Sequence, residues 1–181
     1  ALEEGHAIGN HSYSHNYKYL YPNGEVNYDN FFADFEKADK LLQEVLGEEF
    51  QTRVIRLPGG AMSWKGLDKV KEKLKQDRVA YVDWNVDSSD ASSNHQTKEQ
   101  ILKSVKEGVE YLQSANINQV TILMHDTNAK VSTVEALPEI IDYLKGQGYQ
   151  FKTLTTFDEE NLQDAEVVTD TIDSENSIKS N

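Results

Sequence analysis

Apolar residues that recur every three to four positions predict four helices in this 181-residue chain. The predicted helices span residues 28–46, 64–76, 97–114 and 132–145. Shorter apolar or alternating runs predict five strands, at residues 6–10, 53–57, 79–87, 120–124 and 149–154. Strands that alternate with helices are typical of a parallel sheet covered by helices, so the chain is predicted to be an α/β protein.

Three of these segments also predict which side chains are buried. The apolar face of helix 28–46 consists of Phe31, Phe35, Ala38, Leu42 and Val45. The apolar face of helix 132–145 consists of Val134, Leu137, Ile141 and Leu144. Residues 79–87 alternate, which predicts one strand with Val82, Trp84 and Val86 on one side and Asp83, Asn85 and Asp87 on the other.

The number of predicted strands leaves two architectures open. A (β/α) barrel of the usual type needs about eight strands. Five strands therefore form an open sheet, or they belong to a barrel whose first strands precede Ala1. Residues 1–5 resemble the end of a helix with Gly5 directly after it, which favours the second architecture.

Composition narrows the possible partners. The formal net charge is −13, and a negative surface argues against nucleic acid or an anionic membrane as partner. The chain has no cysteine, so histidine, aspartate and glutamate are the strong metal ligands available. Residues 158–181 are acidic and have no periodicity, which predicts a disordered tail after a single domain at residues 1–157.

A histidine pair follows the first predicted strand. His11 and His15 are four residues apart, which predicts two imidazoles on one face of a helical turn and suits a divalent metal ion. The alternative is two unrelated surface histidines. Nearby tyrosines can either pack or offer flat faces to sugar rings, and they stand at Tyr13, Tyr17, Tyr19 and Tyr21.

Polar side chains also follow three later strands. Arg56 precedes the turn Pro58–Gly60, Asp90 follows the strand that ends at residue 87, and His125 follows the buried strand 120–124. Each has an ordinary alternative: an ion pair at a strand end, a turn aspartate, or a histidine satisfied near the core. In a (β/α) barrel, however, the loops that follow the strands converge on one site.

Taken in order, these residues resemble the motifs of the polysaccharide deacetylases, carbohydrate esterase family 4, with the nodulation-factor deacetylase (NodB) homology fold. The second motif, His-(Ser/Thr)-x-x-His, corresponds to His11-Ser-Tyr-Ser-His15. The third, Arg-x-Pro-x-Gly, corresponds to Arg56-Leu-Pro-Gly-Gly60. The fourth, Asp-x-x-Asp-Trp, matches Asp87-Ser-Ser-Asp90 and departs at Ala91, and the fifth, Leu-x-His, is Leu123-Met-His125.

The resemblance implies a distorted (β/α) barrel of the polysaccharide deacetylase type, with its N-terminal strands missing from this chain. The family's first motif, Thr-Phe-Asp-Asp, is absent here and would lie on those strands. Its aspartates are the third metal ligand and the catalytic base of the family. This chain alone is therefore expected to be inactive.

The resemblance also implies roles around the metal. His11 and His15 would hold a divalent ion, zinc first, with cobalt, nickel and iron as alternatives. Arg56 would orient the missing carboxylate base through a charge-assisted pair. The backbone N–H of Gly59, where the family usually has tyrosine, would help to bind the oxyanion.

The remaining roles belong to the proton donor and the acetyl pocket. His125 would protonate the departing amine, and Asp90 beside it would favour the imidazolium form. Leu123 would contact the acetyl methyl group. Because Ala91 replaces the usual tryptophan, either Trp84 or another side chain covers the site, or the site is wetter and the reaction slower.

The expected activity is removal of N-acetyl groups from an N-acetylglucosamine polymer, with peptidoglycan as first candidate and chitin-like oligosaccharides as second. The resemblance implies an extracellular or cell-wall location in bacteria. One alternative is an O-acetyl esterase that acts on xylan. The other is a catalytically degenerate member of the family that binds a glycan or a metal. The observations that favour this alternative are the missing first motif, Gly59 and Ala91.

Overall fold

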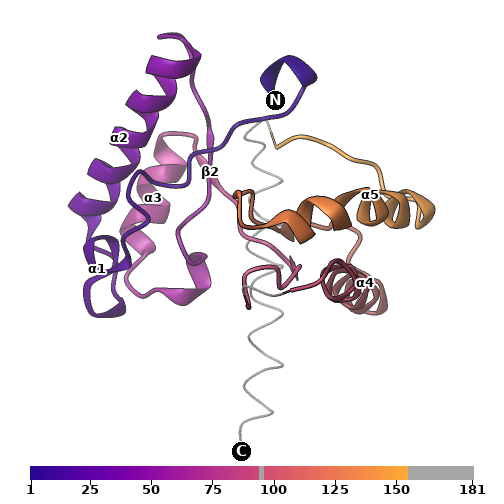
Figure 1. The fold of residues 1–181 in the computed structure, drawn as a ribbon. Coiled ribbons are helices and arrows are strands. Elements are labelled where there is room, and N and C mark those ends of the chain that lie inside the picture. The colour runs from indigo at the N-terminus through magenta and orange to yellow at the C-terminus, as the bar shows by residue number, and fades with distance from the viewer. Residues whose placement is uncertain (94–95, 155–181) are drawn as a thin grey trace, which may run out of the picture. The chain divides into compact units, whose positions relative to one another are not determined.

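The computed structural model describes residues 1–93 and 96–154, which form two compact parts. The N-terminal part is Ala1–Asp83, joined by residues 153–154, and the C-terminal part is Trp84–Lys152 (Figure 1). The predicted acidic tail at 158–181 lies outside the described residues.

The N-terminal part contains two long helices and a small parallel sheet. Its elements are η1 (Leu2–Glu4), α1 (Tyr17–Leu20), η2 (Pro22–Gly24), α2 (Tyr28–Leu46), β1 (Val54–Ile55), η3 (Ala61–Ser63), α3 (Asp68–Gln76) and β2 (Ala80–Tyr81). β1 pairs in parallel with β2, Val54 opposite Ala80, and Asn10 forms a single parallel bridge with Ile55 on the other side. The predicted strand 6–10 is therefore reduced to one bridging residue.

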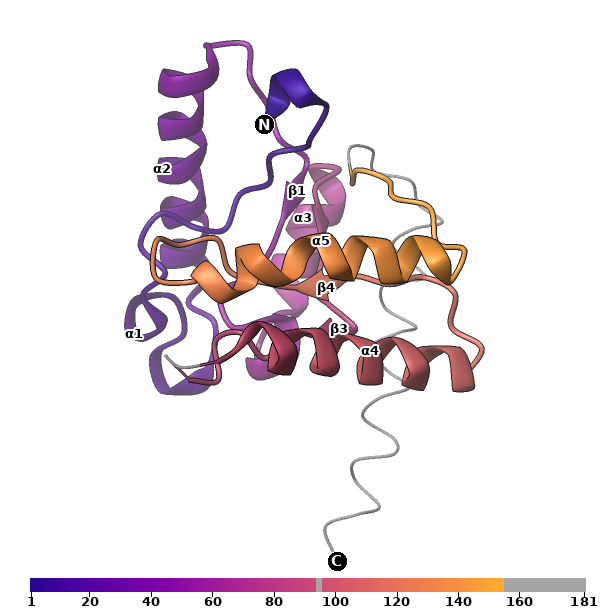
Figure 2. The same cartoon turned by 45° about the vertical axis from the view of Figure 1, so that its right-hand side comes forward.

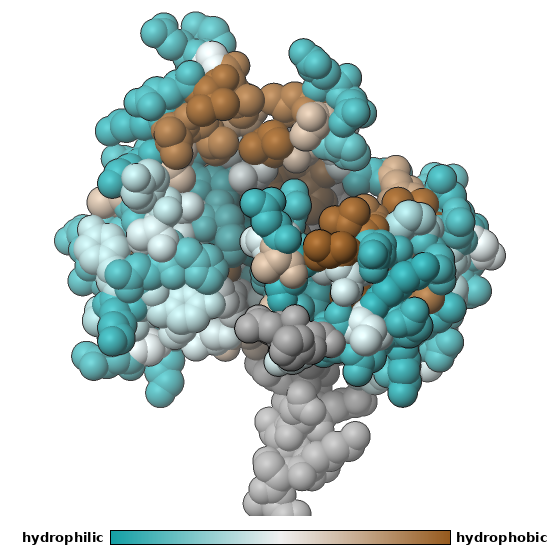
Figure 3. Space-filling model, viewed as in Figure 1, coloured by the Kyte–Doolittle hydropathy of each residue, from teal (hydrophilic) through white to brown (hydrophobic). Residues whose placement is uncertain are grey.

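α2 begins and ends where the periodicity predicts. Asn27 caps its first turn by accepting from the Asn30 N–H, and Gly47 follows its last residue. Phe31, Phe35 and Ala38 are buried as predicted, but Val45 is 73% exposed. Figure 3 shows apolar side chains gathered over the C-terminal end of the helix, where Leu41, Val45 and Leu46 are exposed.

The C-terminal part consists of β3 (Val86–Asp87), α4 (Lys98–Ser114), β4 (Ile122–Leu123) and α5 (Val131–Gly146). β3 and β4 pair in parallel, and α4 and α5 lie side by side (Figure 2). The predicted capping box of Thr97 and Gln100 starts α4. α4 approaches β3 at Gly108, where an added Cβ would lie 2.8 Å from the Val86 side chain.

The predicted buried face of α5 is confirmed at Leu144, is only partly buried at Ile141, and is wrong at Val134 and Leu137. Val134 is 64% exposed and Leu137 is also exposed, whereas the buried positions are Thr133, Ala136, Ile140 and Leu144. The small side chain of Ala136 suits close packing of α5 on α4, and Thr133 donates to a buried carboxylate of another loop. These long-range partners, rather than the apolar period, decide which face is turned inward.

The prediction of a single strand at 79–87 is also wrong. Its two ends belong to different sheets, because β2 pairs with β1 and β3 pairs with β4. Tyr81 and Val86 are five residues apart and would face opposite sides of one continuous strand, yet both are buried, so the alternation does not extend across residues 79–87. Within the described residues, the predicted strand at 149–154 does not form either.

None of the helices in the described residues is long and apolar enough to cross a membrane.

Candidate functional site

The loop that carries His11 and His15 is not the predicted helical turn. Ser12 and His15 have left-handed backbone conformations, with φ of 70° and 49°. The two imidazole rings nevertheless lie close together, 5.0 Å between ring centroids. Non-glycine residues pay about 1–2 kcal/mol for this conformation, so the surroundings must hold the loop in place.

Asp34 on α2 holds this loop through its buried carboxylate. Its Oδ2 accepts hydrogen bonds from the backbone N–H groups of Tyr13 and Ser14, both at 3.0 Å. Asp34 belongs to none of the sequence motifs. A signal was present, because Asp34 falls on the same face of the helix as Phe31 and Ala38, where a charged side chain has no packing reason to lie.

Asn10 supports the loop from its other end. Its side-chain oxygen accepts from the Ser12 N–H at 2.9 Å. Its amide nitrogen donates to the Phe35 carbonyl at 2.9 Å and to Asp39 Oδ1 at 2.7 Å. Burial raises the pKa of Asp39, although the Asn10 hydrogen bond opposes the shift. The histidine loop is therefore anchored on α2 at two buried polar residues.

The orientation of His11 suits a metal ligand. Its Nδ1 lies 2.8 Å from the carbonyl oxygen of Arg56. A carbonyl can only accept, so Nδ1 carries the hydrogen and the lone pair is on Nε2, the arrangement common among metal-bound histidines. His11 and His15 thus fit two ligands of a divalent ion. In residues 1–93 and 96–154, no three or more histidine, aspartate or glutamate side chains come together as a complete metal site.

Arg56 is half-buried beside a carboxylate that the sequence analysis placed on the polar side of a strand. Its Nε donates to the Val82 carbonyl at 3.0 Å, and burial lowers the pKa of Arg56 while Asp83 opposes that shift. Asp83 Oδ2 accepts from the Ala61 N–H at 2.8 Å. Burial raises the pKa of Asp83 against the Ala61 hydrogen bond and the Arg56 charge. Asp83 therefore ties the turn after Gly60 to the end of β2.

Gly59 occupies a position where any other residue would be strained. Its φ is 80°, and an added Cβ would lie 3.0 Å from the Trp64 ring. The Trp64 indole N–H donates to the Pro58 carbonyl at 2.8 Å, so the ring lies over the turn. Sequence reasoning gave Trp64 no role, because no local pattern links it to residue 59.

Asp90 and His125 come together as the sequence analysis expected. Asp90 Oδ1 lies 2.7 Å from His125 Nδ1, and Oδ2 accepts from the His125 N–H at 2.7 Å. Thr133 Oγ1 donates to Oδ2 at 3.0 Å, and Lys130 donates to the Asp90 carbonyl. Asp90 is 1% exposed and the His125 side chain is 41% exposed. The ring is therefore fixed at Nδ1 and accessible at its other side.

The electrostatics of Asp90 follow from its donors. Burial by itself would raise the pKa of Asp90, but the hydrogen bonds from the His125 ring, the His125 N–H and Thr133 outweigh it. The net result is a lowered pKa, so the carboxylate stays ionised near neutral pH.

The other predicted site residues are placed as follows. Tyr13 is exposed, while Trp84 and Leu123 are half-buried and Ala91 is exposed. Asp87 is exposed and accepts from the Ser89 N–H in a turn. The predicted residues divide between the N-terminal part (His11, Tyr13, His15, Arg56, Gly59) and the C-terminal part (Trp84, Asp90, Leu123, His125). Their convergence on one reaction centre stays a prediction.

Comparisons with known proteins agree on one family. The family model described as polysaccharide deacetylase matches residues 1–82. A peptidoglycan-N-acetylglucosamine deacetylase of Bacillus cereus is 31% identical over 82% of this chain. A carbohydrate esterase family 4 structure from Streptococcus mutans superposes with a TM-score of 0.77 at 35% identity, covering 83% of this chain and 63% of that one.

A second solved structure is the catalytic domain of peptidoglycan N-acetylglucosamine deacetylase from Eubacterium rectale. It superposes with a TM-score of 0.70 at 28% identity, covering 87% of this chain and 69% of that one. The chain spans about half the length of the curated relatives it matches. The structures confirm the predicted fold class, the barrel of the polysaccharide deacetylase type. The family model, the curated relatives and the solved structures all show that this chain is similar to the polysaccharide deacetylases of carbohydrate esterase family 4.

Proposed function

We propose that the protein containing this chain is a metal-dependent hydrolase that removes N-acetyl groups from N-acetylglucosamine residues of peptidoglycan. The observation that carries the proposal is the Asp90–His125 pair, a buried and saturated carboxylate bonded to an accessible imidazole. The Bacillus cereus and Eubacterium rectale proteins, named for peptidoglycan deacetylation, supply the substrate class. Such an activity belongs at the bacterial cell wall.

In this proposal His11 and His15 hold a divalent ion, zinc first. When bound, the ion polarises the acetamide carbonyl and lowers the pKa of a bound water. The carbonyl of Arg56 keeps the His11 ring turned with Nε2 available. The third ligand and the catalytic base are proposed to come from a segment outside this chain.

His125 is the proposed proton donor to the departing amine. Its Nδ1 hydrogen is held by Asp90, so Nε2 is the atom that exchanges a proton with the leaving group. The low pKa of Asp90 keeps a negative charge beside the ring throughout the reaction. Leu123, on β4 two residues before His125, is the proposed contact for the acetyl methyl group.

Two residues of the N-terminal part are proposed to assist the chemistry. The Gly59 turn offers a main-chain N–H to the tetrahedral oxyanion, and glycine at this position lets the backbone come close. The Arg56 guanidinium orients the base carboxylate. Asp83 supports this side of the site because its carboxylate accepts the Ala61 N–H and its negative charge interacts with the Arg56 guanidinium.

The test uses the full-length protein, incubated with EDTA and then reloaded with zinc or cobalt. We expect acetate release from N-acetylglucosamine oligomers and from peptidoglycan in the loaded protein, and none after EDTA. Faster release from acetylated xylan would identify an O-acetyl esterase. Absence of release from every N- or O-acetylated glycan under all metals would leave only a glycan- or metal-binding role.

A further inference from the structure

Three aromatic side chains of the N-terminal part form a continuous cluster, which we call the aromatic wall: Tyr17, Tyr21 and Trp64. Tyr21 is buried and stacks on the Trp64 indole, 4.1 Å between centroids with the planes 10° apart. Tyr17 meets the indole edge to face at 5.1 Å. Trp64 is thus fixed from beneath by Tyr21 and through its own N–H by the Pro58 carbonyl.

The aromatic wall touches two predicted elements of the reaction site. Tyr17 lies 5.2 Å from the His15 ring, centroid to centroid, so it adjoins the histidine pair. The Trp64 ring lies over Gly59, at the turn proposed to bind the oxyanion. The wall therefore runs from the metal-ligand pair to the oxyanion turn, within one part of the molecule.

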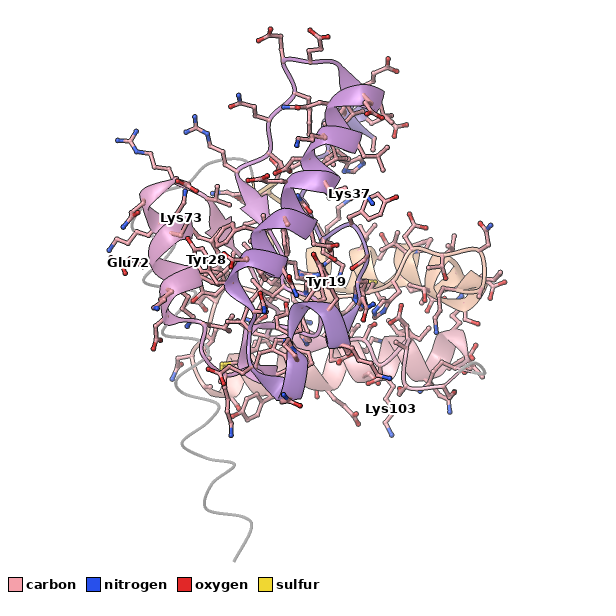
Figure 4. All side chains as sticks on the ribbon, turned by 90° about the vertical axis from the view of Figure 1, so that its left-hand side faces the viewer. Tyr19, Tyr28, Lys37, Glu72, Lys73 and Lys103 are labelled. Carbon is pink, nitrogen blue, oxygen red and sulfur yellow. The ribbon has the colours of Figure 1, made fainter. Side chains whose placement is uncertain are left out.

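Tyr17 is better placed than the other exposed tyrosines of the N-terminal part to meet a substrate. Tyr13 has Lys37 over its ring at 3.8 Å, and Lys37 projects from α2 as seen in Figure 4. The Tyr28 ring packs against Phe32, 4.8 Å between centroids. Tyr19, which Figure 4 shows on α1, is exposed like Tyr17 and serves as a comparison residue on the same helix.

We propose that the aromatic wall binds the apolar face of a hexopyranose ring, with Tyr17 as the stacking residue and Trp64 as its support. This inference rests on the proposed function, because it assigns the sugar whose N-acetyl group would face His15. A pyranose ring presents a row of C–H groups on one face, which packs on an aromatic ring while its hydroxyls remain in water. In this proposal the tyrosine that contacts the substrate is Tyr17, and no longer Tyr13 as predicted from the sequence.

The experiment compares Tyr17→Ala, Tyr17→Phe and Tyr19→Ala in the metal-loaded full-length protein. The substrates are N-acetylglucosamine tetramer and 4-nitrophenyl acetate, which has an ester to cleave but no sugar ring. We expect Tyr17→Ala to raise KM for the tetramer about fivefold to tenfold, the range of one aromatic contact. Tyr17→Phe keeps the ring and is expected to stay within about twofold of wild type, as is Tyr19→Ala.

Hydrolysis of 4-nitrophenyl acetate separates stacking from an effect on the histidine pair. We expect Tyr17→Ala to leave this rate and the bound metal content unchanged. An equal loss on both substrates, or an unchanged KM for the tetramer, would overturn the inference. Trp64→Phe retains an aromatic support and is expected to lie between wild type and Tyr17→Ala.

Binding measurements distinguish failure of this inference from failure of the proposed function. If the wild-type protein releases no acetate, titration calorimetry with the same tetramer still tests the wall. Binding that is weakened in Tyr17→Ala and kept in Tyr19→Ala would support it without catalysis. Binding that is equal in all three proteins, or absent in the wild type, would refute it.

Discussion

The two parts of the chain position their chemical groups in different ways. In the N-terminal part, the histidine pair sits on a loop with two left-handed residues, and buried polar groups near or on α2 hold its backbone. In the C-terminal part, Asp90 is bonded directly to His125 and saturated by three donors. The metal half of the proposed site therefore depends on backbone placement, whereas the acid–base half depends on one side-chain pair.

The largest expected effect comes from the C-terminal pair. His125→Ala should lower kcat about 10²–10⁴-fold, because it removes the proposed proton donor, while metal content stays unchanged. His15→Ala should instead lower the metal content itself. Both are measured by acetate release and elemental analysis of the full-length protein. Loss of metal in His125→Ala would show that this residue is a ligand and that the division of roles is wrong.

Asp34→Ala tests whether the N-terminal half depends on its anchor. Removing the carboxylate leaves the N–H groups of Tyr13 and Ser14 without their charged acceptor, a loss of at most about 1.5–3 kcal/mol for each part-buried hydrogen bond. We expect a lower melting temperature and metal affinity weakened about 10–100-fold, as for other groups that orient ligands. The control is Glu36→Ala, an exposed acidic residue on the same helix. Unchanged metal affinity in Asp34→Ala would mean that the loop keeps its shape unaided.

Thr133→Val makes a smaller change in the C-terminal half. It preserves the shape of the side chain and removes one of the three donors to Asp90 Oδ atoms. We expect a stability loss of about 1.5–3 kcal/mol, the value of a hydrogen bond to a charged group, measured by denaturant unfolding. Thr133→Ser keeps the hydroxyl and should restore most of it. Equal stability of Thr133→Val and wild type would contradict the saturated-carboxylate description.

The contributions of buried Asp90 and half-buried Asp83 to the free energy of unfolding should change with pH in opposite directions. The folded-state pKa of Asp90 is lowered, so its contribution is present above the unfolded value of about 3.9 and is lost as pH falls. The folded-state pKa of Asp83 is raised, so its contribution is greatest at low pH and declines as pH rises above about 3.9. Each group changes stability by at most about 1.4 kcal/mol per pH unit.

Unfolding curves from pH 2 to 8 measure these slopes as differences from Asp90→Asn and Asp83→Asn. Trp64 reports on the N-terminal part and Trp84 on the C-terminal part, so variants that keep one tryptophan assign each transition. The Asp90→Asn difference should grow with pH, and the Asp83→Asn difference should shrink. Slopes of the same sign would show that the two carboxylates are not distinguished by their surroundings.

Local patterns predicted the elements whose ends are fixed by local interactions. α2 ends at Gly47 and α4 starts at the Thr97 capping box, as the sequence indicates. The ordered motifs also led to the family that the comparisons match, and they singled out His11, His15, Asp90 and His125, whose roles stay predictions. Helix caps involve residues a few positions apart, and the motifs are recognised by their order along the chain, so both can be identified without a structure.

Only the tertiary structure decided the features that depend on distant partners. Asp34 is 21 residues from the Tyr13 N–H that it accepts from, and Thr133 is 43 residues from Asp90. The break within residues 79–87 arises because its two ends pair with different strands. Likewise, the Trp64 ring lies against Gly59, a contact that their separation along the sequence does not predict.

The sequence by itself therefore determined the family resemblance, the main helices and the side chains that we propose as reactive. The tertiary structure decided which polar residues are buried as their supports, which face of α5 is covered, and which tyrosine adjoins the histidine pair. The physical reason is that helix periodicity and capping depend on interactions between residues close in sequence. Burial of a carboxylate or an aromatic ring is favourable only when residues distant in the chain supply its hydrogen bonds and packing contacts.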